Sequence, residues 1–90
     1  MSRIQVIYSG KVQGVGFRWK VLQISKKYAV SGYVQNLNNG KVVLLVEGKD
    51  SQVGKMVEEV DTELRNYWYS LERETKLGEP HFKDFSIKEY

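Results

Sequence analysis

The sequence predicts an α+β fold: a ferredoxin-like α/β sandwich in which two helices cover one face of a mostly antiparallel sheet. Three observations carry this prediction. Apolar residues alternate with a period of two in several segments and recur with a helical period in two others. An Asn-Gly pair, a strong hairpin signal, lies between two extended runs near the middle of the chain. The 90 residues include one proline and no low-complexity stretch, which fits a single domain over residues 1–90.

The first part of the chain is typical of a strand, a loop and a helix. Apolar and polar residues alternate in "RIQVIYSG", which predicts a strand over 3–9. The glycines of 10–16 break this alternation and indicate a loop, and a helical period then predicts a helix over 17–29. Lys26 and Lys27 would lie in the last turn of that helix, where cations interact favourably with its dipole.

A β-hairpin is expected after the first helix. Extended runs over 32–37 and 41–47 flank Asn39 and Gly40, a pair that favours a two-residue type I′ turn. The second run, "KVVLLVE", shows little alternation, as expected of a central strand that is covered on one face and partly on the other.

The rest of the chain predicts a second helix and further strands. Asp50 or Ser51 can cap this helix. Its apolar stripe consists of Val53, Met56, Val57, Val60 and Leu64. Residues 65–76 are aromatic-rich and either continue the helix or form a strand. After the turn cluster "KLGEP", Phe85 and Ile87 lie on one side of a last strand, so the expected order is βαββαβ with an extra C-terminal strand.

Composition narrows the chemistry. The chain has no cysteine, which excludes disulfides, a thiol nucleophile and thiolate metal ligands, and fits a reducing compartment. No apolar run is long enough to span a bilayer or to act as a secretion signal, so a cytoplasmic location is the expectation. The formal net charge is +3, and the basic residues are scattered. His81, the one histidine, follows Pro80 and is more typical of a packing or surface residue than of a catalytic base.

The segment "GKVQGVGFR" at 10–18 carries the clearest chemical signal. Gly10, Gly14 and Gly16 permit positive φ angles and close approach of a ligand to the backbone. Unpaired N–H groups at the start of a helix, together with its dipole, favour an anion. Arg18 lies in the first helical turn, where its charge is unfavourable unless an anion offsets it. A glycine loop that is simply a turn is the competing interpretation, and neither common nucleotide-binding glycine motif is present.

The same segment resembles the phosphate-loop signature of acylphosphatases, G-x-V-Q-G-V-x-[FY]-R. The segment "GYVQNLNNGKV" at 32–42 resembles the second motif of that family, G-[WY]-V-x-N-x-x-[DN]-G-x-V, and the spacing between the two motifs also fits. The residues "FSI" at 85–87 are similar to the family's closing strand. The resemblance therefore covers nearly the whole chain, as one acylphosphatase-like domain.

The resemblance implies a small hydrolase, an acylphosphate phosphohydrolase, that cleaves acyl phosphates to a carboxylate and inorganic phosphate. By position, Arg18 would bind the substrate phosphate and Asn36 would hold and orient the attacking water. The backbone that would cradle the phosphate belongs to Gln13, Gly14, Val15, Gly16 and Phe17. No cofactor and no metal are implied. The expected partner is a small-molecule acyl phosphate, with no nucleic acid and no membrane, and a monomer suits the size.

Elementary chemistry agrees with this assignment. A carboxylate is a good leaving group, so hydrolysis depends mainly on positioning and charge stabilisation. A side chain such as Asn36, which is uncharged, would orient water rather than deprotonate it. From the residues alone, without the resemblance, the favoured interpretation of Asn36 is turn chemistry before 38–40. Tyr33 stands where the family often has tryptophan, which keeps an aromatic core role. Leu37 stands where some members carry a hydroxyl residue that could support the asparagine.

Two other functions use the same fold. An RNA-binding module would place stacking aromatics on its central strands, but "KVVLLVEG" has none and the RNP1 pattern is missing. Trp19 and Trp68 could suggest a stacking platform, yet Trp19 falls on the first predicted helix and Trp68 is more simply a core or sheet-face residue. A non-catalytic phosphate- or anion-sensing module is the second alternative, and the presence of both Arg18 and Asn36 argues against it.

Overall fold

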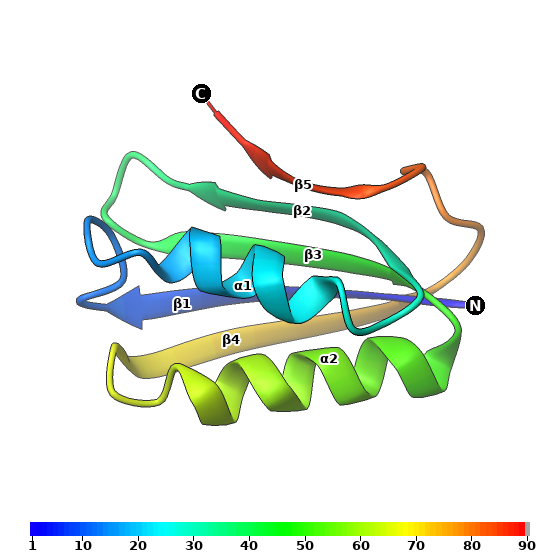
Figure 1. The fold of residues 1–90 in the computed structure, drawn as a ribbon, viewed down its shortest axis with the longest axis horizontal. Helices are drawn as coiled ribbons and strands as arrows, with labels where there is room; N and C mark the ends of the chain where they lie inside the picture. The colour runs from blue at the N-terminus through cyan, green and yellow to red at the C-terminus, as the bar shows by residue number, and fades with distance from the viewer. Residues whose placement is uncertain (90) are drawn as a thin grey trace.

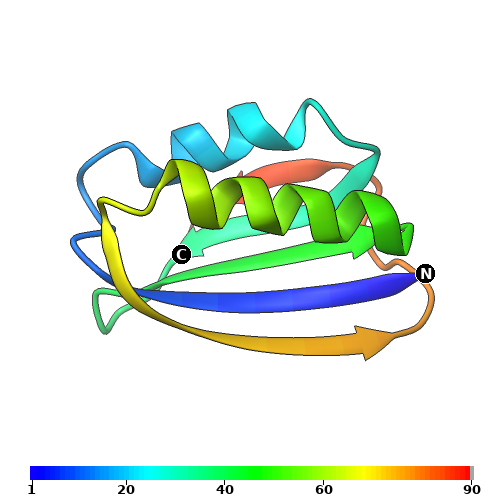
Figure 2. The same cartoon turned by 90° about the horizontal axis from the view of Figure 1, so that it is seen from below.

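The computed structural model describes residues 1–89 and shows a five-stranded sheet with both helices on one face (Figures 1 and 2). The elements are β1 (Ser2–Gly10), α1 (Phe17–Ser25), β2 (Val30–Asn36), β3 (Val42–Gly48), α2 (Asp50–Glu63), β4 (Trp68–Leu77) and β5 (Phe85–Lys88). The strand order is β4-β1-β3-β2-β5, and only the β2–β5 pair is parallel. The predicted ferredoxin-like sandwich is confirmed, with the extra C-terminal strand added beside β2.

The hydrophobic core lies between the sheet and the two helices. Strand β3 is central, between β1 and β2, and all seven of its residues are buried. Its inner side chains meet the apolar stripe predicted for the second helix, which is buried throughout. The core also contains Val6 and Tyr8 from β1 and Phe17, Val21 and Ile24 from α1. The start of α1 therefore packs directly on the sheet.

Helix α1 is shorter than the sequence predicts. It ends at Ser25 rather than at residue 29. The N–H groups of Lys26, Lys27 and Tyr28 donate to carbonyl oxygens three residues back, at 3.0–3.3 Å, which tightens the chain into a turn. Two side chains of this turn reach α2: Lys27 Nζ and the Tyr28 hydroxyl each donate a hydrogen bond to Glu59 at 2.6 Å. The prediction that Lys26 and Lys27 lie in the last helical turn is therefore wrong.

The hairpin between β2 and β3 also differs from the prediction. Its loop has three residues, 38–40, closed by the Leu37 N–H donating to the Lys41 carbonyl at 2.8 Å. A two-residue type I′ turn needs two positive φ angles, but only Gly40 has one here, at 86°. Asn39 instead accepts a hydrogen bond from the Lys41 N–H through Oδ1, at 3.0 Å. The asparagine stabilises the turn through its side chain rather than through a left-handed backbone.

The start and the end of α2 settle two further predictions. Neither Asp50 nor Ser51 caps the helix; Lys49 occupies the N-cap position without a side-chain hydrogen bond, and Asp50 is the first helical residue. An acidic residue in the first turn still interacts favourably with the helix dipole. Beyond the helix, the open alternative for residues 65–76 is resolved as strand β4, which pairs with β1 along its length.

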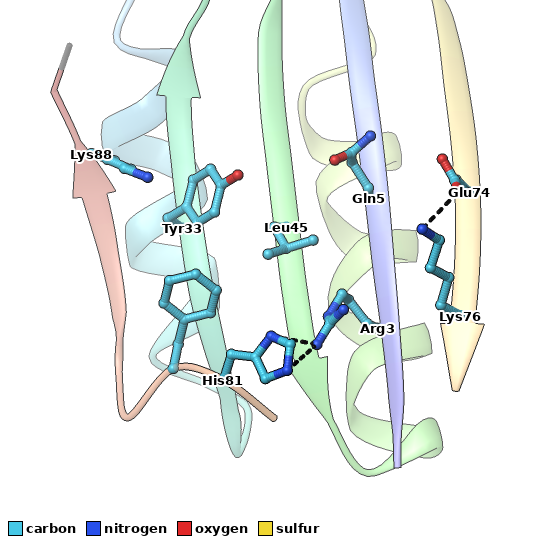
Figure 3. Close-up of a pocket in the computed structure, with 9 residues that line it drawn as sticks. Arg3, Gln5, Tyr33, Leu45, Glu74, Lys76, His81 and Lys88 are labelled. Carbon is cyan, nitrogen blue, oxygen red and sulfur yellow. Dashed lines mark hydrogen bonds and ion pairs between the residues drawn. The ribbon is translucent and has the colours of Figure 1, made fainter. Parts of the chain in front are cut away.

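The face of the sheet away from the helices is partly covered by the segment between β4 and β5 (Figure 3). Tyr33 lies on this face, with its ring 5.4 Å from that of Phe82, so the predicted core role of Tyr33 is wrong. The neighbouring residue Val34 points into the core instead. Beneath the segment lies Glu47, which is 1% exposed and accepts hydrogen bonds from Arg3 Nε at 2.6 Å and from the backbone N–H groups of His81 and Phe82.

Glu47 makes the stability of this fold sensitive to acid. Burial alone would raise the pKa of its carboxyl, but the three hydrogen bonds outweigh burial and lower the pKa. A group with a lowered pKa in the folded state stabilises above its unfolded pKa of about 4.3 and loses that contribution as the pH falls through the folded pKa. Replacing Glu47 by alanine should lower the free energy of unfolding by about 3 kcal/mol at pH 7, because Arg3 and two N–H groups lose their partner.

Urea denaturation at pH 7 and pH 3 checks this prediction. The difference between wild type and Glu47→Ala should be smaller at pH 3 than at pH 7, because the contribution of the carboxylate is lost progressively as the pH falls from the unfolded pKa toward the lowered folded pKa. An equal difference at both pH values would show that the carboxylate charge is not what holds the segment.

Candidate active site

A cavity of about 190 Å³ lies where the start of α1 meets the ends of β2 and β5, on the helix side of the sheet. Its lining residues are Val12, Gly14, Gly16, Phe17, Arg18, Trp19, Asn36, Ile87 and Glu89. The fold thus gathers the glycine loop, the predicted arginine and the predicted asparagine around one space. Figure 1 shows the loop after β1 and the β2–β3 hairpin at the same end of the sheet.

The loop has the backbone geometry of an anion site. Gly14 and Gly16 have φ angles of 77° and 79°, the left-handed region that favours glycine. Gly16 is the N-cap of α1 and provides no side-chain cap. Within residues 1–89, the backbone N–H groups of 13–17 donate to no protein acceptor. Unpaired donors at a helix N-terminus, added to the helix dipole, are the usual elements of a phosphate site.

Gly10, the first glycine of the segment, has a structural role that differs from that of Gly14 and Gly16. It does not line the cavity. A Cβ at this position would come within 2.5 Å of the Tyr67 carbonyl oxygen, so only glycine allows β4 to approach here. The predicted anion loop therefore uses two of the three glycines, and the third serves strand packing.

Gln13 and Phe17 hold the loop in place. Gln13 Nε2 donates to the carbonyl oxygens of Leu37 and Lys41 at 2.7 and 2.8 Å, which ties the loop to the β2–β3 hairpin. The Phe17 side chain is buried against Tyr8, with ring centroids 5.2 Å apart. Of the predicted cradle, Gly14, Gly16 and Phe17 line the cavity, whereas Gln13 and Val15 do not. The link between Gln13 and the hairpin is a feature that sequence reasoning missed.

Arg18 faces the cavity with a guanidinium that is only weakly paired. Its Nη1 lies 3.5 Å from both carboxylate oxygens of Glu89. The Glu89 side chain is 78% exposed, and ion pairs of this length and exposure contribute little to stability. A carboxylate beside Arg18 is also the kind of group that a phosphate would replace. The unfavourable interaction of the Arg18 charge with the helix dipole is thus offset in part by the carboxylate of Glu89.

Asn36 is the last residue of β2, and its Oδ1 is buried with no hydrogen-bond partner. It is the only such buried side-chain atom in the chain as described, residues 1–89. Leaving a buried acceptor unpaired costs about 1–3 kcal/mol, so an orphan of this kind calls for a functional explanation. Asn36 also lines the cavity, and an unpaired amide oxygen is suited to accept a hydrogen bond from a bound water.

Comparison with known proteins agrees with the geometry. The family model for acylphosphatases matches residues 4–87. The chain belongs to the acylphosphatase family. It is 33% identical to the acylphosphatase of Thermotoga petrophila over the full length of both proteins. It is 46% identical to the acylphosphatase of Roseiflexus sp. (strain RS-1) over 63% of this chain and 61% of that relative, a little under two thirds of its length.

Solved acylphosphatases share the whole fold. The crystal structure of acylphosphatase from Bacillus subtilis superposes with a TM-score of 0.84 at 29% identity, over 98% of this chain and 99% of that one. Acylphosphatase from Coxiella burnetii gives a TM-score of 0.78 at 27% identity, over 97% and 92%. Membership of this family supports acylphosphatase enzyme activity for the chain.

A different cavity lies on the far face of the sheet in this acylphosphatase fold. It has a volume of about 320 Å³, and Arg3 and His81 lie in its wall with Tyr33 (Figure 3). The His81 Nδ1 is 2.8 Å from Arg3 Nη2, and neither side chain reaches the Arg18 cavity. In residues 1–89, no three His, Asp or Glu side chains are placed to hold a metal ion, and no helix is long and apolar enough to cross a membrane.

Proposed function

We propose that this chain hydrolyses acyl phosphates to a carboxylate and inorganic phosphate, by attack of a water molecule on phosphorus. The observation that carries the proposal is that Arg18, two glycines of the loop (Gly14 and Gly16) and Asn36, whose Oδ1 has no partner, line one cavity. Family membership supports the reaction class. The roles of the individual residues are inferred from their contacts.

The phosphate group would bind in the glycine loop. The N–H groups of 13–17 would donate to its equatorial oxygens, with the partial positive charge of the α1 N-terminus behind them. The guanidinium of Arg18 would add a full charge and a planar pair of donors, displacing the exposed carboxylate of Glu89. Donors fixed before the reaction stabilise the charge that spreads over these oxygens in the transition state.

The attacking water would be held by Asn36. The unpaired Oδ1 accepts one O–H of the water, which turns a lone pair of the water oxygen toward phosphorus. A new P–O bond forms to water, the bond between phosphorus and the acyl oxygen breaks, and the carboxylate leaves with the electron pair. The protons of the water pass to the product phosphate and solvent. A carboxylate with a pKa near 4 leaves without a proton donor, so no general acid is needed.

Further properties follow as proposals. A small-molecule acyl phosphate is the fitting substrate, because the cavity is small. We propose a monomer, which suits the size of the chain, and light scattering after size exclusion would test this. A cytoplasmic location agrees with the absence of cysteine. No cofactor and no metal have a step in this mechanism.

Hydrolysis of benzoyl phosphate in ¹⁸O-labelled water with EDTA present tests the proposal. We expect turnover that EDTA does not affect, with the label in inorganic phosphate and none in benzoate. Label in benzoate would show attack at the carbonyl carbon and contradict the mechanism. If the folded protein binds phosphate but turns over no acyl phosphate, the anion-sensing alternative replaces this function.

A further inference from the structure

Trp19 is a large aromatic side chain that the fold leaves mostly exposed. It is 59% exposed, and the structure shows no hydrogen bond, ring contact or cation–π contact between Trp19 and any of residues 1–89. The other tryptophan, Trp68, is partly buried: its Nε1 donates to the Asp61 carbonyl at 3.1 Å and its ring lies 6.0 Å from that of Tyr8. Trp68 serves the fold, whereas nothing in the fold explains the exposure of Trp19.

The position of Trp19 associates it with the cavity. It directly follows Arg18 in the first turn of α1, and both residues line the same space. Ile87 of β5 and the edge of Phe17 add apolar surface to that lining. The cavity therefore combines one cationic group with an apolar wall, as a ligand with an anionic end and an apolar end requires.

The proposed reaction indicates which part of the substrate meets this wall. In phosphoryl transfer the attacking and leaving oxygens lie roughly in line through phosphorus. Because the water is assigned to Asn36 on the sheet, the acyl group has to leave on the side away from Asn36. Three parts of the chain line the cavity from outside the sheet: the loop, the first turn of α1 and Glu89 after β5. Among them, Trp19 is the large apolar side chain that is exposed.

We infer that Trp19 forms an acyl-group subsite, and that the preferred substrates are acyl phosphates with a planar, apolar acyl group. The inference rests on the proposed function and names its substrate class. An indole face buries apolar surface against a flat ring or a conjugated chain, and two paired aromatic rings have a more favourable interaction free energy than their buried area alone would give. A methyl group, as in acetyl phosphate, covers little of the indole and gains little from it.

Steady-state kinetics with benzoyl phosphate and acetyl phosphate test the subsite. In Trp19→Ala, kcat/KM for benzoyl phosphate should fall about tenfold, whereas kcat/KM for acetyl phosphate should change by no more than about twofold. The loss should be mainly in KM, because a contact with the acyl group is made in the ground state as well as in the transition state. Trp19→Phe, which keeps a flat ring, should restore most of the benzoyl preference.

Tyr69→Ala is the matched control. Tyr69 is an exposed aromatic residue, 77% accessible, that lies on β4 and does not line the cavity. Its removal should leave the ratio of the two kcat/KM values unchanged. Inhibition by phenylphosphonate and methylphosphonate, which are not hydrolysed, gives a second readout: Trp19→Ala should weaken inhibition by the phenyl compound alone.

Each outcome decides the matter. An unchanged benzoyl-to-acetyl ratio in Trp19→Ala, or an equal fall with both substrates, would overturn the subsite while leaving the proposed function intact. No turnover of either substrate by the wild type would overturn the proposed function, and the subsite with it.

Discussion

Replacing Arg18 by alanine is expected to lower kcat/KM for benzoyl phosphate by about 10³-fold or more. Among residues 1–89, the guanidinium of Arg18 is the one cationic group that lines the cavity. Charge on the phosphoryl oxygens grows toward the transition state. Within residues 1–89, the charged partner of Arg18 is the exposed carboxylate of Glu89 at 3.5 Å, so the free energy of unfolding of the variant should lie within about 0.5 kcal/mol of the wild-type value. Initial rates combined with urea denaturation measure both quantities on the same samples.

Two further variants test the roles of the Arg18 guanidinium and of the Glu89 carboxylate beside it. Arg18→Lys keeps the charge but loses the planar pair of donors, so a large part of the loss should remain. Glu89→Gln removes the carboxylate that faces Arg18 at 3.5 Å and should tighten competitive inhibition by inorganic phosphate, by up to about fivefold. Full activity in Arg18→Ala would remove the arginine from the phosphate site, and unchanged inhibition in Glu89→Gln would show that Glu89 does not compete with phosphate.

The order of the strands and helices was predictable because the hydrophobic pattern reports burial directly. Strand β3 lacks alternation and is buried on both faces, and the stripe of α2 packs into the core as its spacing predicts. The errors fall where a side chain from elsewhere in the chain decides the local structure. Helix α1 ends early at a turn from which Lys27 and Tyr28 reach Glu59 of α2, and no local pattern contains that contact.

In the candidate site too, features that depend on a local sequence pattern were predictable and features that depend on contacts between distant segments were not. The motif around Arg18 and the position of Asn36 could be read from the sequence, because each belongs to a short segment with characteristic spacing. The side chain of Gln13 and the exposure of Trp19 could not, since both depend on how the loop, the hairpin and β5 meet in space. Gly10 is instructive: in the sequence it belongs to the loop, but its lack of a side chain is required by β4.

Asn36 offers the sharpest test of the mechanism, because its replacement should change activity and stability in opposite directions. Asn36→Ala should lower kcat by about 10²- to 10³-fold with little change in KM, since the asparagine is assigned to the water and not to the substrate. The same variant removes a buried oxygen that has no partner, so the free energy of unfolding should stay equal or rise by about 1 kcal/mol. Residues that hold an unsatisfied group for catalysis commonly show this trade-off.

Asn36→Asp provides the control for this prediction. It keeps the shape of the side chain but adds a negative charge next to the bound phosphate, so KM should rise as well as kcat fall. If Asn36→Ala instead destabilised the fold by more than about 1 kcal/mol and kept its activity, Asn36 would be a structural residue of the hairpin, as its position before the turn at 38–40 also allows. A fall in kcat without loss of stability is the result expected if the Asn36 side chain acts on the reaction and not on the fold.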